Sequence, residues 1–296
     1  MSPVESPITQ VSSTTQPALS NTHSEEEHSG TASDDERQQQ QGLPPVLTLE
    51  LRGEQIQISR ETLVAFPESI LIAMFPNGLV LNGGEQAQVD FDPACVRMML
   101  DFFVQARTTH AAHFSEEAYL AETALDNRNI ASAPQHHPLF TKPVVIVLRE
   151  ELDYYILPAQ QHAKPSTSIM ASLKTAGGHY LQQQNQVFEA LLRNISKENN
   201  MAEQHLVDIL CKAGFSLEDT WNYRALEPKR TCISSLSLVH LETSGPQRRM
   251  ATAQKLMMFY GKPARKCWWD HTCVELMDMQ VRLWARRTWT LELALV

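Results

Sequence analysis

The sequence predicts a mixed α/β protein of the α+β kind, with two domains behind a polar N-terminal tail. The 296 residues are 43% hydrophobic, which is enough for a core in more than one domain. Stretches with alternating apolar residues stand next to stretches with apolar residues every three or four positions, and these are the periods of strands and helices. The first 45 residues show neither period.

The predicted organisation has four parts. Residues 1–45 are expected to be a disordered acidic, Gln-rich tail, because seven acidic residues and one Arg give a net charge of −6 and few apolar residues offset the entropy lost on folding. An N-terminal domain is expected over 46–158, with an insertion at 107–143. A connection over 159–183 then leads to a C-terminal α+β domain with antiparallel strands over 184–296.

The N-terminal domain is predicted to begin with a β-hairpin over 46–59. Leucines alternate with polar residues there, and Gly53 marks the turn. Ser59 should cap a short helix that ends before Pro67. The next segment, ESILIAMF, has apolar residues at helical spacing, and a strand is expected over 88–91.

A long amphipathic helix is predicted to start at Asp92, an N-cap residue that is followed by proline at the first helical position. In the insertion, one helix is expected over 115–125, and four histidines there lack the spacing of metal ligands. The stretch VVIVL at 144–148 is predicted to be a buried strand, and REELDYYI a short helix ended by Pro158.

The C-terminal domain is predicted to hold two helices, 184–195 and 200–213, followed by strands at 231–242 and 254–260 and a last strand that runs to the final residue. Along this last strand the apolar residues share one parity, which only Arg287 breaks. The end of the chain is therefore expected to be structural.

The stretch KPARKCWWDHTC at 262–273 carries the candidate metal ligands Cys267, His271 and Cys273. A structural zinc site needs four ligands and usually begins with a Cys-x-x-Cys pair, whereas the spacing here is Cys-x₃-His-x-Cys. A thiol nucleophile at either cysteine is a further interpretation. The alternative is a β-hairpin with a turn near Asp270-His271, whose cysteines and tryptophans pack. The sequence favours the hairpin and no metal or cofactor.

Residues 245–296 carry a net charge of +5 in a chain whose total is −9. Their cations interleave with four tryptophans and are candidate partner-binding residues: Arg248, Arg249, Lys262, Arg265, Lys266, Arg286 and Arg287. One interpretation is a docking surface for an anionic partner. The other is a solvated face over a tryptophan core.

The order of elements over 46–158 resembles the BTB/POZ fold in its potassium-channel tetramerisation variant. The resemblance rests on a helix pair FP-x-S-x-L-x-x-M-F and an Asp-x-Asp-Pro helix start, which match Phe66, Pro67, Ser69, Leu71, Met74, Phe75, Asp90, Asp92 and Pro93. It implies self-association into a homo-oligomer. Asp90 is a candidate for polar contacts between subunits, and Asp92 for helix capping or partner binding.

Over 46–296 the chain is also similar to the fungal regulators related to the yeast general-stress-response protein that activates a plasma-membrane phosphatase. FPESILIAMFPNGLVL, VVIVLREELDYYILP and KPARKCWWDHTCVEL carry this resemblance. It implies a non-enzymatic scaffold that links stress or nutrient signals to a phosphatase. Two alternatives stay open: a cullin-type ubiquitin-ligase adaptor, and a nucleic-acid-associated regulator that uses the basic C-terminal residues.

Several classes are disfavoured by the sequence. No run of about 18 apolar residues predicts a membrane span, and no secretory signal is visible. Five scattered cysteines are unlike a disulfide framework and indicate reduced thiols. The acidic total disfavours nucleic acid as a partner, and no P-loop, GxSxG or HExxH motif occurs. The expected location is the cytoplasm, with the nucleus or a partner at the plasma membrane as further sites.

Overall fold

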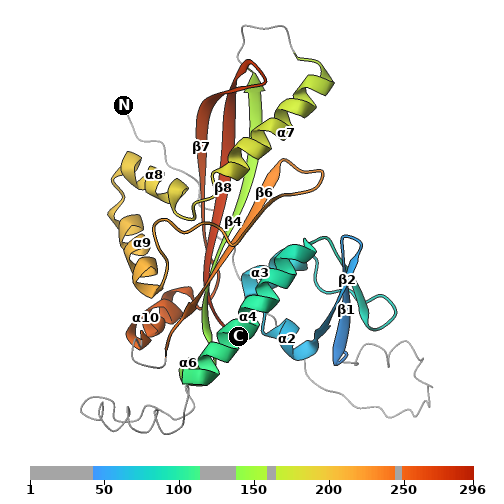
Figure 1. Cartoon of the computed structure of the whole chain (residues 1–296), viewed down its shortest axis with the longest axis vertical. Helices are drawn as coiled ribbons and strands as arrows, with labels where there is room; N and C mark the ends of the chain where they lie inside the picture. Colours follow the sequence, from blue (N-terminus) through green and yellow to red (C-terminus); the bar gives the residue numbers. More distant parts are fainter. Residues whose placement is uncertain (1–42, 114–137, 159–164, 244–248) are drawn as a thin grey trace, which may run out of the picture. The chain divides into compact units, whose positions relative to one another are not determined.

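The computed structural model describes residues 43–113, 138–158, 165–243 and 249–296. Leu43–Val296 forms one compact unit. It contains a three-stranded and a five-stranded sheet with helices packed on them (Figure 1). The predicted mixed α/β class with antiparallel pairing is therefore confirmed. Apart from its last three residues, the predicted tail lies outside the described residues.

The three-stranded sheet has the order β2-β1-β3. Its strands are β1 (Val46–Leu51), β2 (Glu54–Ser59) and β3 (Gln86–Val89), where β1 pairs antiparallel with β2 and parallel with β3. The turn between β1 and β2 uses Arg52 at φ 49° and Gly53 at φ 93°. Positive φ at both central residues is what a tight hairpin turn requires, and it confirms the predicted hairpin.

Three helices accompany this sheet: α2 (Arg60–Val64), α3 (Glu68–Met74) and α4 (Pro93–His113). The Ser59 hydroxyl accepts a hydrogen bond from the Thr62 N–H at 3.1 Å, and the Asp92 carboxylate accepts one from the Ala94 N–H at 2.8 Å. Both predicted caps are confirmed. Helix α4 continues six residues past the predicted start of the insertion at 107, and the helix expected over 115–125 lies outside the described residues.

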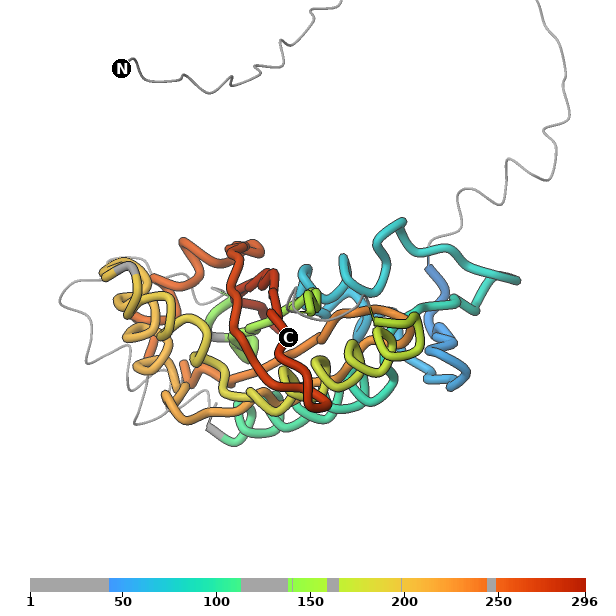
Figure 2. Tube along the Cα trace, turned by 90° about the horizontal axis from the view of Figure 1, so that it is seen from above, coloured from blue at the N-terminus to red at the C-terminus, as the bar shows by residue number. Residues whose placement is uncertain are grey.

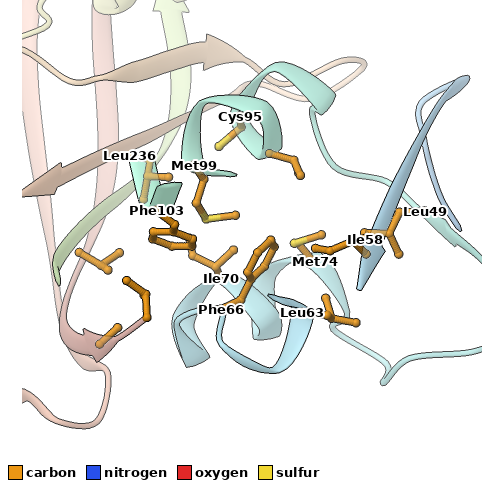
Figure 3. Packing of buried hydrophobic residues seen from close by; sticks show 14 of the residues in the cluster. Leu49, Ile58, Leu63, Phe66, Ile70, Met74, Cys95, Met99, Phe103 and Leu236 are labelled. Carbon is orange, nitrogen blue, oxygen red and sulfur yellow. The ribbon is translucent and has the colours of Figure 1, made fainter. Parts of the chain in front are cut away.

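The first hydrophobic core is shared between these helices, the small sheet and one face of the large sheet. Figure 3 shows Phe66, Ile70 and Met74 directed toward Met99 and Phe103 of α4. The rings of Phe66 and Phe103 meet edge to face, with centroids 5.9 Å apart. The large sheet contributes Val145, Val147, Leu236, Leu238, Ala294 and Val296.

The five-stranded sheet is antiparallel throughout and has the order β5-β6-β4-β8-β7. Its strands are β4 (Val144–Pro158), β5 (Tyr223–Leu226), β6 (Cys232–Leu241), β7 (Ala264–Leu276) and β8 (Met279–Leu295). The predicted strands at 144–148 and 231–242 and the predicted last strand are confirmed. Strand β5 was not expected from the sequence.

Three predicted elements are wrong. REELDYYI is not a helix but part of β4, which β8 pairs along its whole length and β6 pairs as far as Asp153. Residues 254–260 are not a strand but belong to helix α10 (Met250–Tyr260), which buries one stripe of residues at a spacing of three: Met250, Ala253 and Leu256. The predicted polar connection contains helix α7 (Thr167–Gln183).

The remaining helices are α6 (Pro138–Thr141), α8 (Glu189–Glu198) and α9 (Met201–Ala213). Helix α8 begins five residues later than predicted. The side chain of Asn200 caps α9 by accepting from Ala202 N–H at 3.1 Å, and Gly214 ends it at φ 130°. Both ends of α9 match the prediction. In the described part of the chain, no helix combines the length and the apolar character needed to cross a membrane.

The end of the chain belongs to the sheet, as predicted. Val296 is buried, and its N–H donates to the Pro143 carbonyl at 3.1 Å; the C-terminus is marked in Figure 2. Strand β4, which ends the predicted domain 46–158, has both of its partner strands in the predicted domain 184–296. The subdivision of the compact unit into these domains stays a prediction.

Candidate protein-docking surface

The candidate metal ligands lie on strand β7, but the strand keeps them apart. Cys267, His271 and Cys273 have the same parity and are all exposed on one face. Four residues of strand separate the first two by about 13 Å at about 3.3 Å per residue, far beyond what a shared zinc ion allows. Across the described residues, no three His, Cys, Asp or Glu side chains gather as a metal site would need.

The predicted turn near Asp270-His271 is wrong. Strand β7 continues without a break to Leu276, and the turn consists of Met277 and Asp278, at φ 54° and 59°. Both residues take the left-handed conformation that a two-residue hairpin turn requires. Neither is Gly or Asn, so the usual sequence signal for this turn is missing, and the predicted turn lies several residues before the real one.

The candidate cations do not form one continuous basic surface. Arg287 is buried, and its guanidinium donates to Glu150 at 3.0 Å. Arg287 also lies 3.6 Å from Asp270. Three of the other cations are paired as well: Lys262 meets Glu68 at 2.7 Å, Lys266 meets Glu203, and Arg286 meets Asp153 at 2.6 Å. Arg265 is exposed at the start of β7, Arg249 is half-buried before α10, and Arg248 lies outside the described residues.

The other two candidate residues lie beside α4. Asp92 caps this helix, whereas the side chain of Asp90 is 88% exposed and its carboxylate accepts from Arg52 Nε at 2.7 Å. Arg52 also meets Glu227 in the turn between β5 and β6. Burial lowers the pKa of Arg52, but its bonds to Asp90 and Glu227 outweigh this and raise the pKa above its ordinary value. Asp90 as a contact between subunits stays a prediction.

What the structure brings together instead is a group of aromatic rings on the outer half of the large sheet. Tyr155 of β4 is opposite Trp284 of β8, which is opposite His271 of β7. His271 stacks on Trp284 with centroids 4.7 Å apart, and Trp269 contacts Trp284 at 6.5 Å and Tyr155 at 5.9 Å. We call these four residues together with Leu157 the aromatic face.

Consecutive strand residues point to opposite sides of the sheet, so the aromatic face and the residues beneath it belong to different sides. The opposite side of the same strands is buried under α7, where Leu152, Tyr154, Ile156, Val281, Leu283 and Ala285 form a separate core. On the side of the aromatic face, the first core covers β4 only near Val145 and Val147. Further along, Tyr155 is 47%, Leu157 53% and Trp269 55% exposed.

Sequence reasoning found part of this surface. Trp269 and Trp284 are two of the four tryptophans that interleave with the cations, whereas Tyr155 lies in the stretch predicted to be a short helix. The signal that was available is the parity of LDYYILP, in which Leu152, Tyr154 and Ile156 alternate with Tyr155 and Leu157. Because both parities are apolar, the stretch shows no polar face, and the alternation passes unnoticed.

Comparison with known proteins gives the family. No family model matches the chain. The "WHI2-like protein P4H10.16c" of Schizosaccharomyces pombe is 32% identical over 282 residues, which cover 86% of this chain and 90% of the relative. The "Growth regulation protein" of Saccharomyces cerevisiae is 28% identical over 253 residues, 66% of this chain and 52% of the relative. By its similarity to the first of these along most of both sequences, this chain belongs to the family of WHI2-like proteins.

Proposed function

We propose that this protein is a non-enzymatic adaptor that regulates growth by holding a protein partner on the aromatic face. The observation that carries the proposal is the exposure of three large side chains, Tyr155, Leu157 and Trp269, each close to half exposed on one side of one sheet. Growth regulation is the printed description of the S. cerevisiae relative, about half of whose length this chain spans.

The chemistry of the aromatic face fits a protein with an apolar contact surface. Trp and Tyr supply large contact areas with few rotatable bonds, and they dominate the energetics of protein interfaces. Around the rings the charges are mixed: Arg286 is already paired with Asp153, and Glu275 accepts from Gln280 at 3.2 Å. A strongly charged ligand is therefore a poorer match than a polypeptide with aliphatic or aromatic side chains and a polar rim.

Two finer proposals rest on the family resemblances. One is that the partner is a phosphatase and the signal is stress or nutrient supply. The other is that the N-terminal elements have a BTB/POZ-like fold and self-associate. An apolar groove lined by Leu43, Leu63, Val64, Leu71, Ile72, Phe75 and Leu79 supports the second, together with the exposure of Val64 and Ile72 at 64% and 44%. Sedimentation of the full chain with Ile72→Glu, against wild type, tests it: an unchanged molecular mass at high concentration contradicts it.

The main proposal is tested by replacement in living cells. The chain is expressed in S. pombe cells that lack their WHI2-like protein, and growth into nutrient exhaustion is compared with wild-type and deletion cells. We expect the chain to restore the wild-type growth curve. The double variant Trp269→Ala/Trp284→Ala should fail to do so at equal protein level, because the partner loses its main contacts.

The matched control is Phe259→Ala. Phe259 is a large aromatic residue that is 60% exposed on α10, outside the aromatic face. This variant should restore growth as the wild-type chain does. Restoration by the double variant would refute docking on the aromatic face, and failure of the wild-type chain to alter the deletion phenotype would refute the proposed function itself.

A further inference from the structure

Strand β7 is the outer edge of the large sheet and is unusually long for an edge. It spans 13 residues, and none of them is buried. Within the described residues it pairs with β8 alone, whereas the other edge strand, β5, has four residues. A long, open edge offers a row of unpaired backbone N–H and C=O groups, which proteins normally shorten, cover or pair with another chain.

The turn after β7 fixes which backbone groups are free. A two-residue turn closes on a hydrogen-bonded pair, so Leu276 and Met279 form such a pair. Residue pairs in an antiparallel ladder alternate between bonded and non-bonded. The even-numbered residues of β7 are thus bonded to β8, and the N–H and C=O groups of its odd-numbered residues point away from the sheet. These same residues carry the exposed side chains.

We propose that β7 pairs antiparallel with β7 of a second copy of this chain, on a two-fold axis at Asp270. The two five-stranded sheets then join into one. In this register Arg265 lies opposite Glu275 of the second copy, Cys267 opposite Cys273, and Trp269 opposite His271. At its odd-numbered positions the sequence from 265 to 275 is complementary to itself in the reverse direction, since a cation meets an acid, a thiol meets a thiol and an aromatic ring meets an aromatic ring.

Complementarity selects this register over its neighbours. Directly opposite residues in a sheet point to the same side. The register between the two β7 strands can therefore shift only in steps of two residues if the exposed side chains of both copies are to stay on one side. Such a shift would put Arg265 opposite Cys273 in one direction and opposite the turn residue Met277 in the other. Only the axis at Asp270 gives both ends of the pairing an opposite-charge pair, which stabilises neighbouring strands.

The two Asp270 side chains that meet at the axis do not oppose this arrangement. Each carboxylate is 11% exposed and lies 3.2 Å from Arg193 of α8 and 3.6 Å from Arg287 of β8. Both cations belong to the same copy, so each carboxylate is neutralised before the copies meet. The β7 pairing does not involve the groove next to Ile72. A dimer formed through that groove would be distinct from the dimer formed through β7.

A charge exchange on the full chain tests the pairing. We expect the wild-type chain to dimerise reversibly in sedimentation equilibrium. Arg265→Glu and Glu275→Arg should each weaken the dimer about tenfold, because like charges then face each other at both ends. The double variant Arg265→Glu/Glu275→Arg should restore wild-type affinity. Lys255→Glu, at an exposed position of α10, is the control and should change nothing.

Disulfide trapping tests the register. Diamide removes two hydrogens from a pair of facing thiols, and strand residues directly opposite one another lie close enough for a disulfide. In a Cys211→Ser background, Cys267→Ser alone and Cys273→Ser alone should give no cross-linked dimer, because each copy lacks one member of every pair. A mixture of the two variants should cross-link. The proposal would be overturned by any of three results: a wild-type chain that stays monomeric, a dimer whose affinity the charge exchange does not change, or a mixture of the two cysteine variants that does not cross-link.

Discussion

Glu150 lies at the centre of the large sheet, where its buried carboxylate joins two arginines. It accepts a hydrogen bond from Arg224 Nη1 at 2.8 Å and another from Arg287 Nη1 at 3.0 Å. The three side chains are 2%, 5% and 4% exposed. Glu150→Gln removes the negative charge and leaves two guanidinium groups facing one another in a dry interior. Breaking a buried ion pair in this way costs about 3–5 kcal/mol.

The lower part of that range applies here. Arg224 keeps its bonds to the Ser235 hydroxyl at 2.5 Å and the Leu181 carbonyl at 3.1 Å, and Arg287 remains 3.6 Å from Asp270. We therefore expect Glu150→Gln to lower the free energy of unfolding by about 3 kcal/mol, measured by urea denaturation of the full chain. Since domains are stable by only about 5–15 kcal/mol, such a loss should clearly lower the urea concentration at the midpoint of unfolding.

The neighbouring residue provides the control. Glu151 is bonded to Arg149 at 2.6 Å, but its side chain is 44% exposed, so Glu151→Gln should cost at most about 1 kcal/mol. Equal effects of the two substitutions would refute the reasoning. So would a stable Glu150→Gln chain, because the argument depends on burial and on the two unpaired cations.

The pH dependence has a defined sign. Burial alone would raise the pKa of Glu150, but Arg287 and Arg224 outweigh it and hold the pKa below the ordinary value for a glutamate. Its contribution to stability is thus present above that ordinary pKa and is lost as the pH falls through the pKa of the folded state. The difference between wild type and Glu150→Gln should be full at pH 7 and shrink in strong acid. A difference that grows on acidification would contradict the assignment.

Three further predictions concern single elements. Asp92→Ala should lower stability by about 1 kcal/mol through loss of the α4 cap, and Asp90→Ala by less, in thermal melts; the reverse order would contradict the capping role. Gly178→Ala should destabilise by about 1–3 kcal/mol, because its Cβ would collide with Tyr154; a more stable variant would exclude that contact. Deleting 288–296 removes about half of the pairing between β8 and β4 and should abolish cooperative unfolding; a truncated chain that still melts cooperatively would contradict the role of this segment.

Much of the local structure could be predicted because it depends on neighbours in sequence. The predicted caps at Ser59 and Asp92 each bond a backbone group two or three residues away, so the residue type and its position are sufficient. Alternation likewise predicted the hairpin over 46–59 and the last strand. Arg287, the one residue that broke the parity of that strand, is buried with the rest.

The errors have a common cause. The stretch 159–183, which contains Gly177-Gly178, is predicted to be a connection, but the structure has helix α7 there. In the structure these glycines let α7 approach the sheet, since a Cβ on Gly177 would come within 2.5 Å of Ile156. REELDYYI is predicted to be a helix, and it is a strand because β8 pairs with all of it and β6 with its residues up to Asp153. In each case the deciding contact comes from a distant part of the chain.

The sequence by itself determined where α2, α4 and α9 begin, which residues alternate in the first hairpin and the last strand, and which family the chain resembles, because these depend on residue types over short spans. The tertiary structure decided which cations are neutralised and which rings are exposed. Arg287 meets Glu150 across 137 residues of chain, and Tyr155 meets Trp269 across three strands. Such pairs depend on strand order and register, which no local period encodes. The same strand order turned a stretch that resembled a metal site into the open edge of a sheet.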